Sequence, residues 1–142
     1  MEVNDVDAVL AIEQSSFPIP WKREHFLHEI SSNHTYPYVA CADGLLAGYV
    51  CLMSLFEESQ ILNVAVAPDQ RGKGIALALM TFAIETAREK AAEVMLLEVR
   101  ASNAEAIALY ERLDFKRTGV RNNYYEGVDD ALLMEKQLKE SL

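Results

Sequence analysis

Cysteine is scarce in this 142-residue sequence, which has only Cys41 and Cys51. They lie in apolar segments on either side of Asp43 and Gly44, a dipeptide typical of a two-residue hairpin turn. In such a hairpin Cys51 would pair near Tyr36, too far along the ladder from Cys41 for a disulfide. Neither cysteine has a neighbouring histidine or a metal-ligand spacing, so we expect two small buried side chains and no metal site.

The sequence also lacks a long apolar run and a basic N-terminal region. Its apolar segments fall well short of a membrane span, and the N-terminus carries the acidic residues Glu2, Asp5 and Asp7. Lysine and arginine number 13 against 22 aspartates and glutamates, which gives a formal net charge of -9. We therefore expect a soluble, cytoplasmic protein that binds neither a membrane nor nucleic acid directly, while a basic protein or peptide partner stays open.

Repeats and low-complexity segments are absent, and 51% of the residues are hydrophobic. A chain of this length and composition has enough apolar material for one core. We expect a single domain over residues 1–142, present as a monomer or weak dimer.

Hydrophobic spacing in the N-terminal half predicts helices at residues 4–14 and 22–32. Strands are expected at residues 36–42, 46–55 and 61–66, with a polar connection at residues 57–60 before the last of them. The sequence FPIPW at residues 17–21 interrupts the helical pattern with two prolines. Its Phe17 and Trp21 either staple two helices together or form a wall beside a substrate, and the residues alone leave both readings open.

The C-terminal half is expected to contain a helix at residues 75–89 with one buried stripe of Ile75, Leu79, Phe82 and Ala83. A strand buried on both faces follows at residues 94–99. Next come a helix at residues 102–113, opened by a capping box of Ser102 and Glu105, and strands at residues 116–120 and 131–138 around a polar loop at 121–125. Strands 61–66 and 94–99 flank a helix, so a right-handed crossover should make them parallel. The fold class is therefore α/β with a mixed sheet.

The most informative stretch is RGKGIA at residues 71–76, between an apolar strand and a helix. Gly72 and Gly74 allow the main-chain N–H groups to form a concave nest, to which the helix adds the positive end of its dipole. Arg71 and Lys73 bring positive charge to an acidic chain. The pattern predicts an anion site, with phosphate as the favoured guest; a basic turn with glycines for tight packing is the alternative.

Glu98 is a charged residue in an otherwise apolar strand, near the same strand end as residues 71–76. Burial would favour the neutral carboxyl and suit a general base. Pairing with Arg100 would oppose this effect, and a purely structural Glu98–Arg100 pair is the alternative.

Asn103, Ile107 and Tyr110 are four and three residues apart and share one helix face. Tyr110 could present its phenol as a proton donor, or be a half-buried aromatic with its hydroxyl in water. His25, His28 and His34 have no carboxylate or cysteine that completes a metal set, so we expect surface or capping histidines.

On these residues the chain resembles the GNAT N-acetyltransferase family. RGKGIA matches that family's acyl-coenzyme A signature, (R or Q)-x-x-G-x-(G or A), and SNAEAIALYERLDF at residues 102–115 is similar to its helix with an Asn and a Tyr. LEVRASNAEAIALYERLDF at residues 97–115, the NNYY sequence and the FPIPW turn resemble more particularly the RimI branch, which acetylates the N-terminal alanine of a small-subunit ribosomal protein. The resemblance covers nearly the whole chain.

The resemblance implies a mostly antiparallel central sheet with helices on both faces, and a V-shaped splay between strands 61–66 and 94–99 that admits the pantetheine of acetyl-CoA. It implies Glu98 as the general base that takes the proton of the substrate amine, and Tyr110 as the general acid that protonates the thiolate. Cofactor contacts would come from Val64, Ala65, Val66, Arg71, Gly72, Lys73, Gly74, Ile75, Ala76, Asn103 and Tyr110. No metal is implied.

Three features depart from the family pattern. Ala76 replaces the commoner Gly, Asp114 replaces the Gly usual after this helix, and the family's first strand is missing or reduced to Glu2 and Val3. The acceptor pocket would be built from residues 17–21, 53–60 and 121–126, so a small-molecule amine or another protein N-terminus is an alternative acceptor. A coenzyme A-binding module without catalysis is the third possibility.

Overall fold

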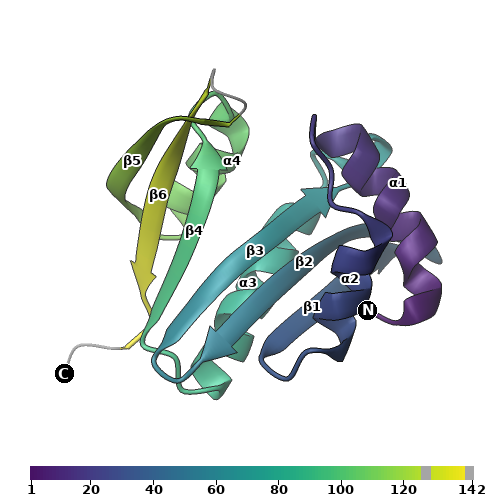
Figure 1. Cartoon of the computed structure of the whole chain (residues 1–142), viewed down its shortest axis with the longest axis horizontal. Coiled ribbons are helices and arrows are strands. Elements are labelled where there is room, and N and C mark those ends of the chain that lie inside the picture. The colour runs from purple at the N-terminus through teal and green to yellow at the C-terminus, as the bar shows by residue number, and fades with distance from the viewer. Residues whose placement is uncertain (126–128, 140–142) are drawn as a thin grey trace.

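The structure, a computed structural model, describes residues 1–125 and 129–139. The described part of the chain contains four α-helices and six strands, which are labelled in Figure 1. None of the described helices is long and apolar enough to cross a membrane. The elements follow in the order 3-10 helix η1 (Val3–Asp5), α1 (Val6–Ser16), α2 (Arg23–Ser31), β1 (Thr35–Ala42), β2 (Leu45–Leu55), β3 (Glu58–Val66), 3-10 helix η2 (Pro68–Gln70), α3 (Ile75–Glu89), β4 (Val94–Arg100), α4 (Ala104–Arg112), β5 (Lys116–Tyr125) and β6 (Asp129–Gln137).

The strands form one sheet in the order β1-β2-β3-β4-β6-β5. β3 and β4 pair in parallel, and all other neighbours are antiparallel, which confirms the predicted mixed sheet. The first hairpin turns at Asp43 and Gly44, whose φ values of 53° and 79° suit a two-residue turn of the primed type. No strand precedes Thr35 in the described residues, and residues 3–5 form a 3-10 helix instead.

The parallel pair β3 and β4 separates soon after it forms. Residues 58–60 pair with residues 94–96, and the ladder between the two strands stops there. Beyond this point β3 continues beside β2 and β4 continues beside β6, so the two strands diverge toward their carboxyl ends (Figure 1). The V-shaped splay expected from the family resemblance is therefore present.

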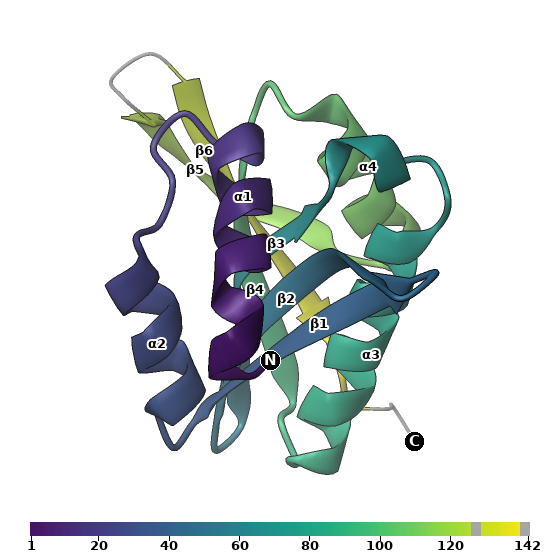
Figure 2. The same ribbon diagram turned by 90° about the vertical axis from the view of Figure 1, so that its right-hand side faces the viewer.

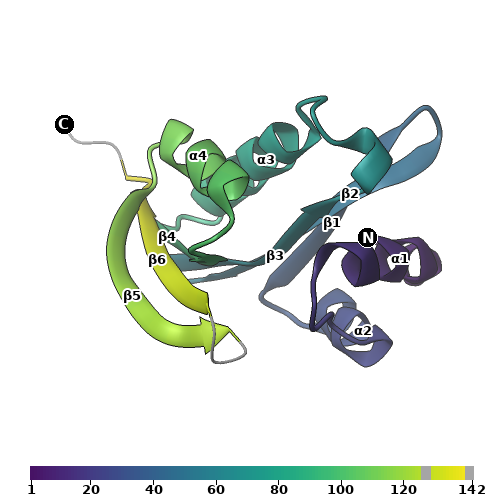
Figure 3. The same ribbon diagram turned by 90° about the horizontal axis from the view of Figure 1, so that it is seen from above.

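Helices cover both faces of the sheet, as expected. α3 and α4 lie on one face and α1 and α2 on the other (Figure 3). The first layer encloses the larger apolar cluster, which includes Leu52, Met80 and Phe115, and the second encloses a smaller one around Val9, Phe26 and Tyr49. Each fully buried aliphatic or aromatic side chain of this kind stabilises the fold by about 1.5–3 kcal/mol.

The buried stripe of α3 differs from the prediction at one position. Leu79 and Ala83 are buried, but Phe82 is 49% exposed and meets the ring of Tyr38 edge-on, with 4.8 Å between ring centroids. Phe82 lies beyond the edge of the apolar face, where β1 ends the sheet. Its ring covers a strand edge instead of filling the core.

Two polar segments predicted as loops lie on strands, apart from Glu57, which stays in the turn before β3. β3 already begins at Glu58, because Phe56 takes a positive φ of 55° and β2 and β3 are joined by a two-residue turn. Ser59 is fully buried and donates a hydrogen bond from Oγ to the carbonyl of Val94 at 2.8 Å. Residues 121–125 likewise belong to β5. Both segments pair with a neighbouring strand, the second with a register shift between Arg121 and Tyr125, and polarity alone does not reveal such pairing.

The cysteines form no disulfide, as expected. Cys51 is buried and faces Pro37 in the ladder, one residue from the predicted partner because of a register shift. The prediction for Cys41 is wrong, since this side chain is exposed on the edge strand β1. Burial raises the pKa of the Cys51 thiol well above its usual range, with a further contribution from the charges of Glu29 and Glu13.

Candidate active site

The loop between η2 and α3 has the geometry of an anion site. Gly72 and Gly74 take left-handed φ values of 78° and 82°, and a Cβ built on either would meet no atom within 4 Å. Gly74 is also the N-cap of the 15-residue helix α3, and no side chain caps the main-chain N–H groups there. Open space, a helix N-terminus and uncapped donors together fit the pyrophosphate of acetyl-CoA.

The two basic side chains of this loop are held at its rim. Arg71 donates from Nε to the carbonyl of Val66 and from Nη2 to Oγ of Ser16, both at 3.2 Å. Lys73 donates from Nζ to Oε1 of Gln70 at 3.2 Å. Arg71 therefore ties the loop to the end of β3 and to the end of α1, while its charge stays beside the anion site.

The edge of β3 that faces the splay supplies unshared main-chain groups. Val64, Ala65 and Val66 pair with β2 on one side, and the ladder to β4 has already ended at Gln60. Main-chain N–H and C=O groups on that edge can bind a pantetheine amide, because β4 no longer pairs with β3 there. Of these groups, the carbonyl of Val66 already accepts the hydrogen bond from Arg71.

Glu98 lies on β4 where that strand has left β3. The prediction that both faces of β4 are buried is wrong, because burial alternates: Met95, Leu97 and Val99 pack into the larger cluster, and Glu98 faces the other way. α1 and α2 lie on that second face over β1 to β3 and do not extend over β4 (Figure 3). The Glu98 side chain is 24% exposed as a result.

Glu98 pairs with an arginine other than Arg100, the partner considered as an alternative from the sequence. Oε1 of Glu98 lies 3.3 Å from Nη1 of Arg121 on β5, whereas Arg100 forms an ion pair with Asp129 at 3.9 Å. Asp129 also accepts a hydrogen bond from Oγ of Ser102 at 2.5 Å. Glu98 is therefore paired with Arg121 of β5, and Arg100 with Asp129 at the start of β6.

Asn103 and Tyr110 both lie on α4, which starts directly after β4. Asn103, not the predicted Ser102, is the N-cap, and its Oδ1 accepts the main-chain N–H of Ala106 at 3.2 Å. Tyr110 is only 6% exposed and packs edge-on against Phe115, with 5.9 Å between centroids. The alternative of a half-buried Tyr110 is therefore wrong, since the residue is buried.

Glu98 and Tyr110 come from opposite faces of the sheet. Tyr110 belongs to the cluster that contains Leu97 and Val99, the two residues that flank Glu98 and point the other way. Only where β3 diverges from β4 can one substrate complex contact both side chains. That position is also the strand end from which the 71–76 loop leads into α3.

A buried carboxylate that the sequence did not reveal is Glu13 on α1, which is 1% exposed. Its carboxylate accepts hydrogen bonds from the hydroxyl of Tyr49, from Nδ2 of Asn63 at 2.7 Å and from the main-chain N–H of Trp21 at 2.9 Å. Burial raises the pKa of the Tyr49 phenol well above its usual range, and the bond to Glu13 raises it further. The sequence feature that could have indicated this buried carboxylate is an acidic residue beside Ile12, next to the apolar stripe of the helix.

The connection between α1 and α2 is built around Trp21. Its ring stacks on His25 at 3.6 Å and tilts against Phe26 at 5.2 Å between centroids. It also lines a surface hollow of about 550 Å³ together with Ile19, Pro20, Lys22, Glu24, His25 and His28. Trp21 thus does both things considered from the sequence: it packs against α2 and it lines a surface hollow. No group of three or more His, Cys, Asp or Glu side chains among the described residues could hold a metal ion.

The turn at residues 53–60 lies at the wrong end of the sheet to share an acceptor pocket with residues 17–21. The main chain of Glu93 donates to the carbonyl of Glu57 at 2.7 Å, which places the turn beside the start of β4. Ser16, by contrast, contacts Arg71 at the carboxyl end of β3. Of the residues expected in this pocket, residue 126 lies outside the described part.

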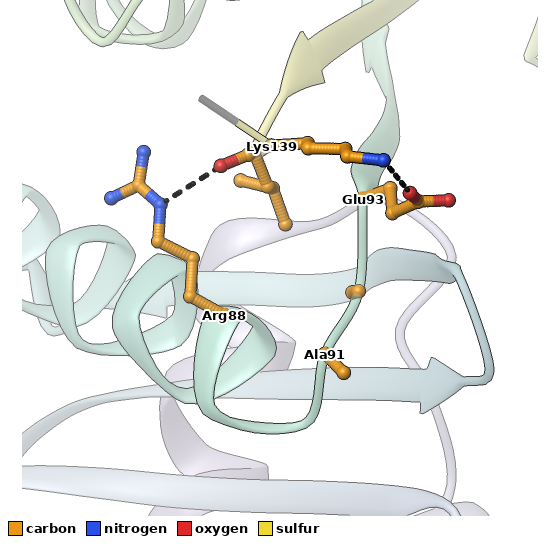
Figure 4. Close-up of a pocket in the computed structure, with 6 residues that line it drawn as sticks. Arg88, Ala91, Glu93 and Lys139 are labelled. Carbon is orange, nitrogen blue, oxygen red and sulfur yellow. Dashed lines mark hydrogen bonds and ion pairs between the residues drawn. The ribbon is translucent and has the colours of Figure 1, made fainter. Parts of the chain in front are cut away.

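A second hollow, of about 380 Å³, lies beside the same end of the sheet (Figure 4). Arg88 donates from Nε to the carbonyl of Leu138 at 3.4 Å, and Lys139 pairs with Glu93 at 3.0 Å. These contacts attach the last turn of α3 and the start of β4 to the residues that follow β6. The hollow is at the opposite end of α3 from Gly74, so it does not belong to the site described above.

Comparison with known proteins agrees with this geometry. The model of the acetyltransferase (GNAT) family matches residues 6–115. A Bacillus subtilis relative is 39% identical over 136 residues, covering 94% of this chain and 90% of the relative. The ribosomal protein bS18-alanine N-acetyltransferase of Escherichia coli K12 is 34% identical over 140 residues, covering 94% of this chain and 92% of the relative.

The crystal structure of the ribosomal-protein-S18-alanine N-acetyltransferase from Escherichia coli superimposes with a TM-score of 0.91 at 31% identity. The match covers 99% of this chain and 92% of that chain. Enzymes of this family transfer an acetyl group from acetyl-CoA, and the loop, the splay and the uncapped helix end fit that donor. The chain is therefore an N-acetyltransferase that belongs to the GNAT family.

Proposed function

We propose that this enzyme acetylates the α-amine of a protein N-terminus, and that its acceptor is the N-terminal alanine of ribosomal protein bS18. The main support is the likeness over 94% of the chain to a relative whose name states this acceptor. The formal net charge of -9 suits a basic acceptor segment, because complementary charge speeds encounter.

Glu98 is the proposed general base. An α-amine has a pKa of about 7.7–8.0 and is largely protonated at neutral pH, so it must lose a proton before it attacks a thioester. Glu98 is a carboxylate on the face of β4 that the helices leave uncovered, and it can take that proton directly or through water. Acetyl-CoA supplies the acetyl thioester when it is bound.

Tyr110 is the proposed general acid. It approaches the splay from the α4 side of the sheet, in the larger apolar cluster, where a thiolate is poorly solvated. A phenol at this position can donate its proton to the departing sulfur. Residues 71–76 would hold the pyrophosphate, the main chain of Val64, Ala65 and Val66 would bind the pantetheine arm, and Asn103 would contact it with the part of its amide not used in capping.

The acceptor peptide is proposed to lie on the Glu98 face of the sheet. The connection at residues 17–22 begins beside Arg71 at the carboxyl end of β3, as the Ser16 contact shows. The β5–β6 hairpin extends to the same side as α1 and α2 (Figures 2 and 3). These two segments border the proposed base from opposite sides.

The test is acetylation of peptides that differ only at residue one, with acetyl-CoA as donor. We expect a preference for the bS18 sequence starting with Ala over the same peptide starting with Gly, Met or Leu. Absence of that preference contradicts the acceptor assignment, and faster turnover of polyamines or amino sugars assigns the enzyme to small-molecule acceptors. Coenzyme A binding without transfer to any amine contradicts a catalytic role.

A further inference from the structure

The guanidinium of Arg121 lies beside the carboxylate of Glu98, which the substrate amine is expected to approach. Nη1 of Arg121 lies 3.3 Å from Oε1 of Glu98. The Arg121 side chain is 53% exposed and the Glu98 side chain 24% exposed, so the pair lies at the surface of the proposed acceptor site. Nothing in the reaction as described above requires an arginine there.

The register of the sheet explains how Arg121 reaches Glu98 from two strands away. Arg121 faces Ala131 on β6, and Ala131 in turn faces Arg100 on β4. Glu98 is in the adjacent row, opposite Leu133, on the same face. Because Ala131 is small, a long side chain can cross it diagonally.

The strand segment that carries Arg121 is fixed by contacts other than the pair itself. The main-chain N–H of Asn123, which has a φ of 50°, donates to Oδ1 of Asp130 at 2.7 Å. The register also shifts between Arg121 and Tyr125, which marks a bulge. Cζ of Arg121 lies 5.4 Å from the ring centroid of Tyr124, so the guanidinium has a second support beside Glu98.

The guanidinium and a substrate ammonium compete for the same carboxylate. An arginine side chain is always charged, and an α-amine is largely ammonium at neutral pH. A partly exposed ion pair is weak, so an incoming ammonium can replace it. After displacement, the guanidinium can keep its cation–π contact with the ring of Tyr124.

We propose that Arg121 is a displaceable internal counter-ion of Glu98, which occupies the cation position of the acceptor site until the substrate ammonium takes it. This role rests on the proposed function of Glu98. In the free enzyme Arg121 holds the carboxylate oriented toward the open face, and on binding the Glu98–Arg121 pair is exchanged for a Glu98–ammonium pair. Arg121 acts through Glu98 and is therefore a positioning residue.

The kinetic test compares Arg121→Gln, Arg121→Lys and the matched control Arg117→Gln. Arg117 lies on the same strand but pairs with Glu111 of α4 at 3.2 Å. With the bS18 peptide as acceptor, we expect Arg121→Gln to lower KM, read separately from kcat, by about two- to five-fold, since a weak competing ion pair is removed. Arg121→Lys should retain a KM closer to that of the wild type, and Arg117→Gln should leave KM unchanged.

A KM that rises or stays constant in Arg121→Gln contradicts the proposal, as does an equal fall in Arg117→Gln. A merely structural arginine would not lower KM when it is removed. A Tm measured for each variant shows whether the fold is kept, and Arg121→Ala, which also removes the charge, supplies the result if Arg121→Gln does not fold.

A binding test separates this proposal from the proposed function. Methylguanidinium chloride, titrated by NMR without acetyl-CoA, should bind Arg121→Gln more tightly than the wild type, and adding Glu98→Gln should abolish the gain. Equal binding to all three proteins contradicts the counter-ion role. If no amine is acetylated, the proposed function fails, and this titration still decides the role of Arg121.

Discussion

Glu98 owes its position to strand alternation. Its neighbours Leu97 and Val99 point into the larger apolar cluster, so the carboxylate emerges on the opposite face, where no helix covers β4. Tyr110 reaches the same strand from the other side of the sheet. A strand thereby separates the proposed base from the proposed acid, and the proposed reaction places the amine and the thiolate on different sides of the splay.

Glu98→Gln and Tyr110→Phe test these roles. Each should lower turnover by roughly 10²-fold or more, the usual contribution of a positioned acid or base, because each keeps the shape of the side chain and removes the proton-transfer group. Acetyl-CoA binding, measured by calorimetry, should remain near that of the wild type. Glu111→Gln, on the exposed face of α4, is the control. Turnover at the wild-type rate in either active-site variant removes its assigned role.

Residue identities were predictable from the sequence where a single side chain breaks a pattern. Glu98 interrupts an apolar strand, and Gly72 and Gly74 interrupt a strand-to-helix junction. Pairings across the sheet were not predictable. Glu98 pairs with Arg121, and Arg100 pairs with Asp129. These pairings depend on the register between β5 and β6, which the sequence does not show.

At the scale of elements, the connection between α1 and α2 is held by one buried carboxylate. Glu13 joins Trp21 to Tyr49 and Asn63, so a helix, a connection and two strands share one acceptor group. Removal of such a group leaves buried donors unsatisfied, at about 1–3 kcal/mol each. The carboxylate thus fixes the segment proposed to border the acceptor.

Glu13→Gln should weaken this connection selectively. The amide oxygen can still accept from Tyr49 and Asn63, but its NH₂ group would then oppose the N–H of Trp21. We expect an increase in KM for the acceptor peptide of roughly ten-fold and an unchanged KM for acetyl-CoA. Tyr49→Phe, which removes another bond to Glu13 without touching Trp21, should lower the free energy of unfolding and leave the acceptor KM near the wild-type value. Equal acceptor KM values in both variants would contradict the link.

The glycine loop before α3 allows a matched comparison. Gly74 and Gly44 have φ values of 82° and 79°, and a Cβ at either would meet no protein atom within 4 Å. Gly74→Ala and Gly44→Ala should therefore lose similar stability, about 1–2 kcal/mol each, measured by chemical denaturation. Only Gly74→Ala should raise the KM for acetyl-CoA, by roughly ten-fold, because its methyl group enters the pyrophosphate position. Equal KM values for acetyl-CoA in both variants would show that the loop does not hold the cofactor.

Element prediction succeeded where hydrophobic spacing was long and regular. The predicted helix at residues 75–89 has the observed bounds, Ile75–Glu89. The prediction of loops is wrong at residues 58–60 and 121–125, which are polar strand segments. A strand on a partly solvated sheet can be polar, because neighbouring strands supply hydrogen bonds to its main chain. The sequence of one segment does not show which strands will be its neighbours.

For the whole molecule, the order of helices and strands and the parallel crossover followed from the sequence, whereas the splay came from the family resemblance alone. The divergence of β3 from β4 after three paired residues depends on the twist and on the packing of both layers. The formal net charge of -9 likewise belongs to the whole molecule, and complementary charge would speed encounter with a basic segment without selecting its first residue.

The most direct measurement is a crystal structure of the enzyme with acetyl-CoA. We expect the pyrophosphate on the main-chain N–H groups of residues 72–76, the pantetheine between β3 and β4, and the thioester sulfur within hydrogen-bonding distance of the Tyr110 hydroxyl. A cofactor bound elsewhere, for example in the hollow beside Arg88 and Lys139, or a thioester remote from both Tyr110 and Glu98, would contradict the proposed site.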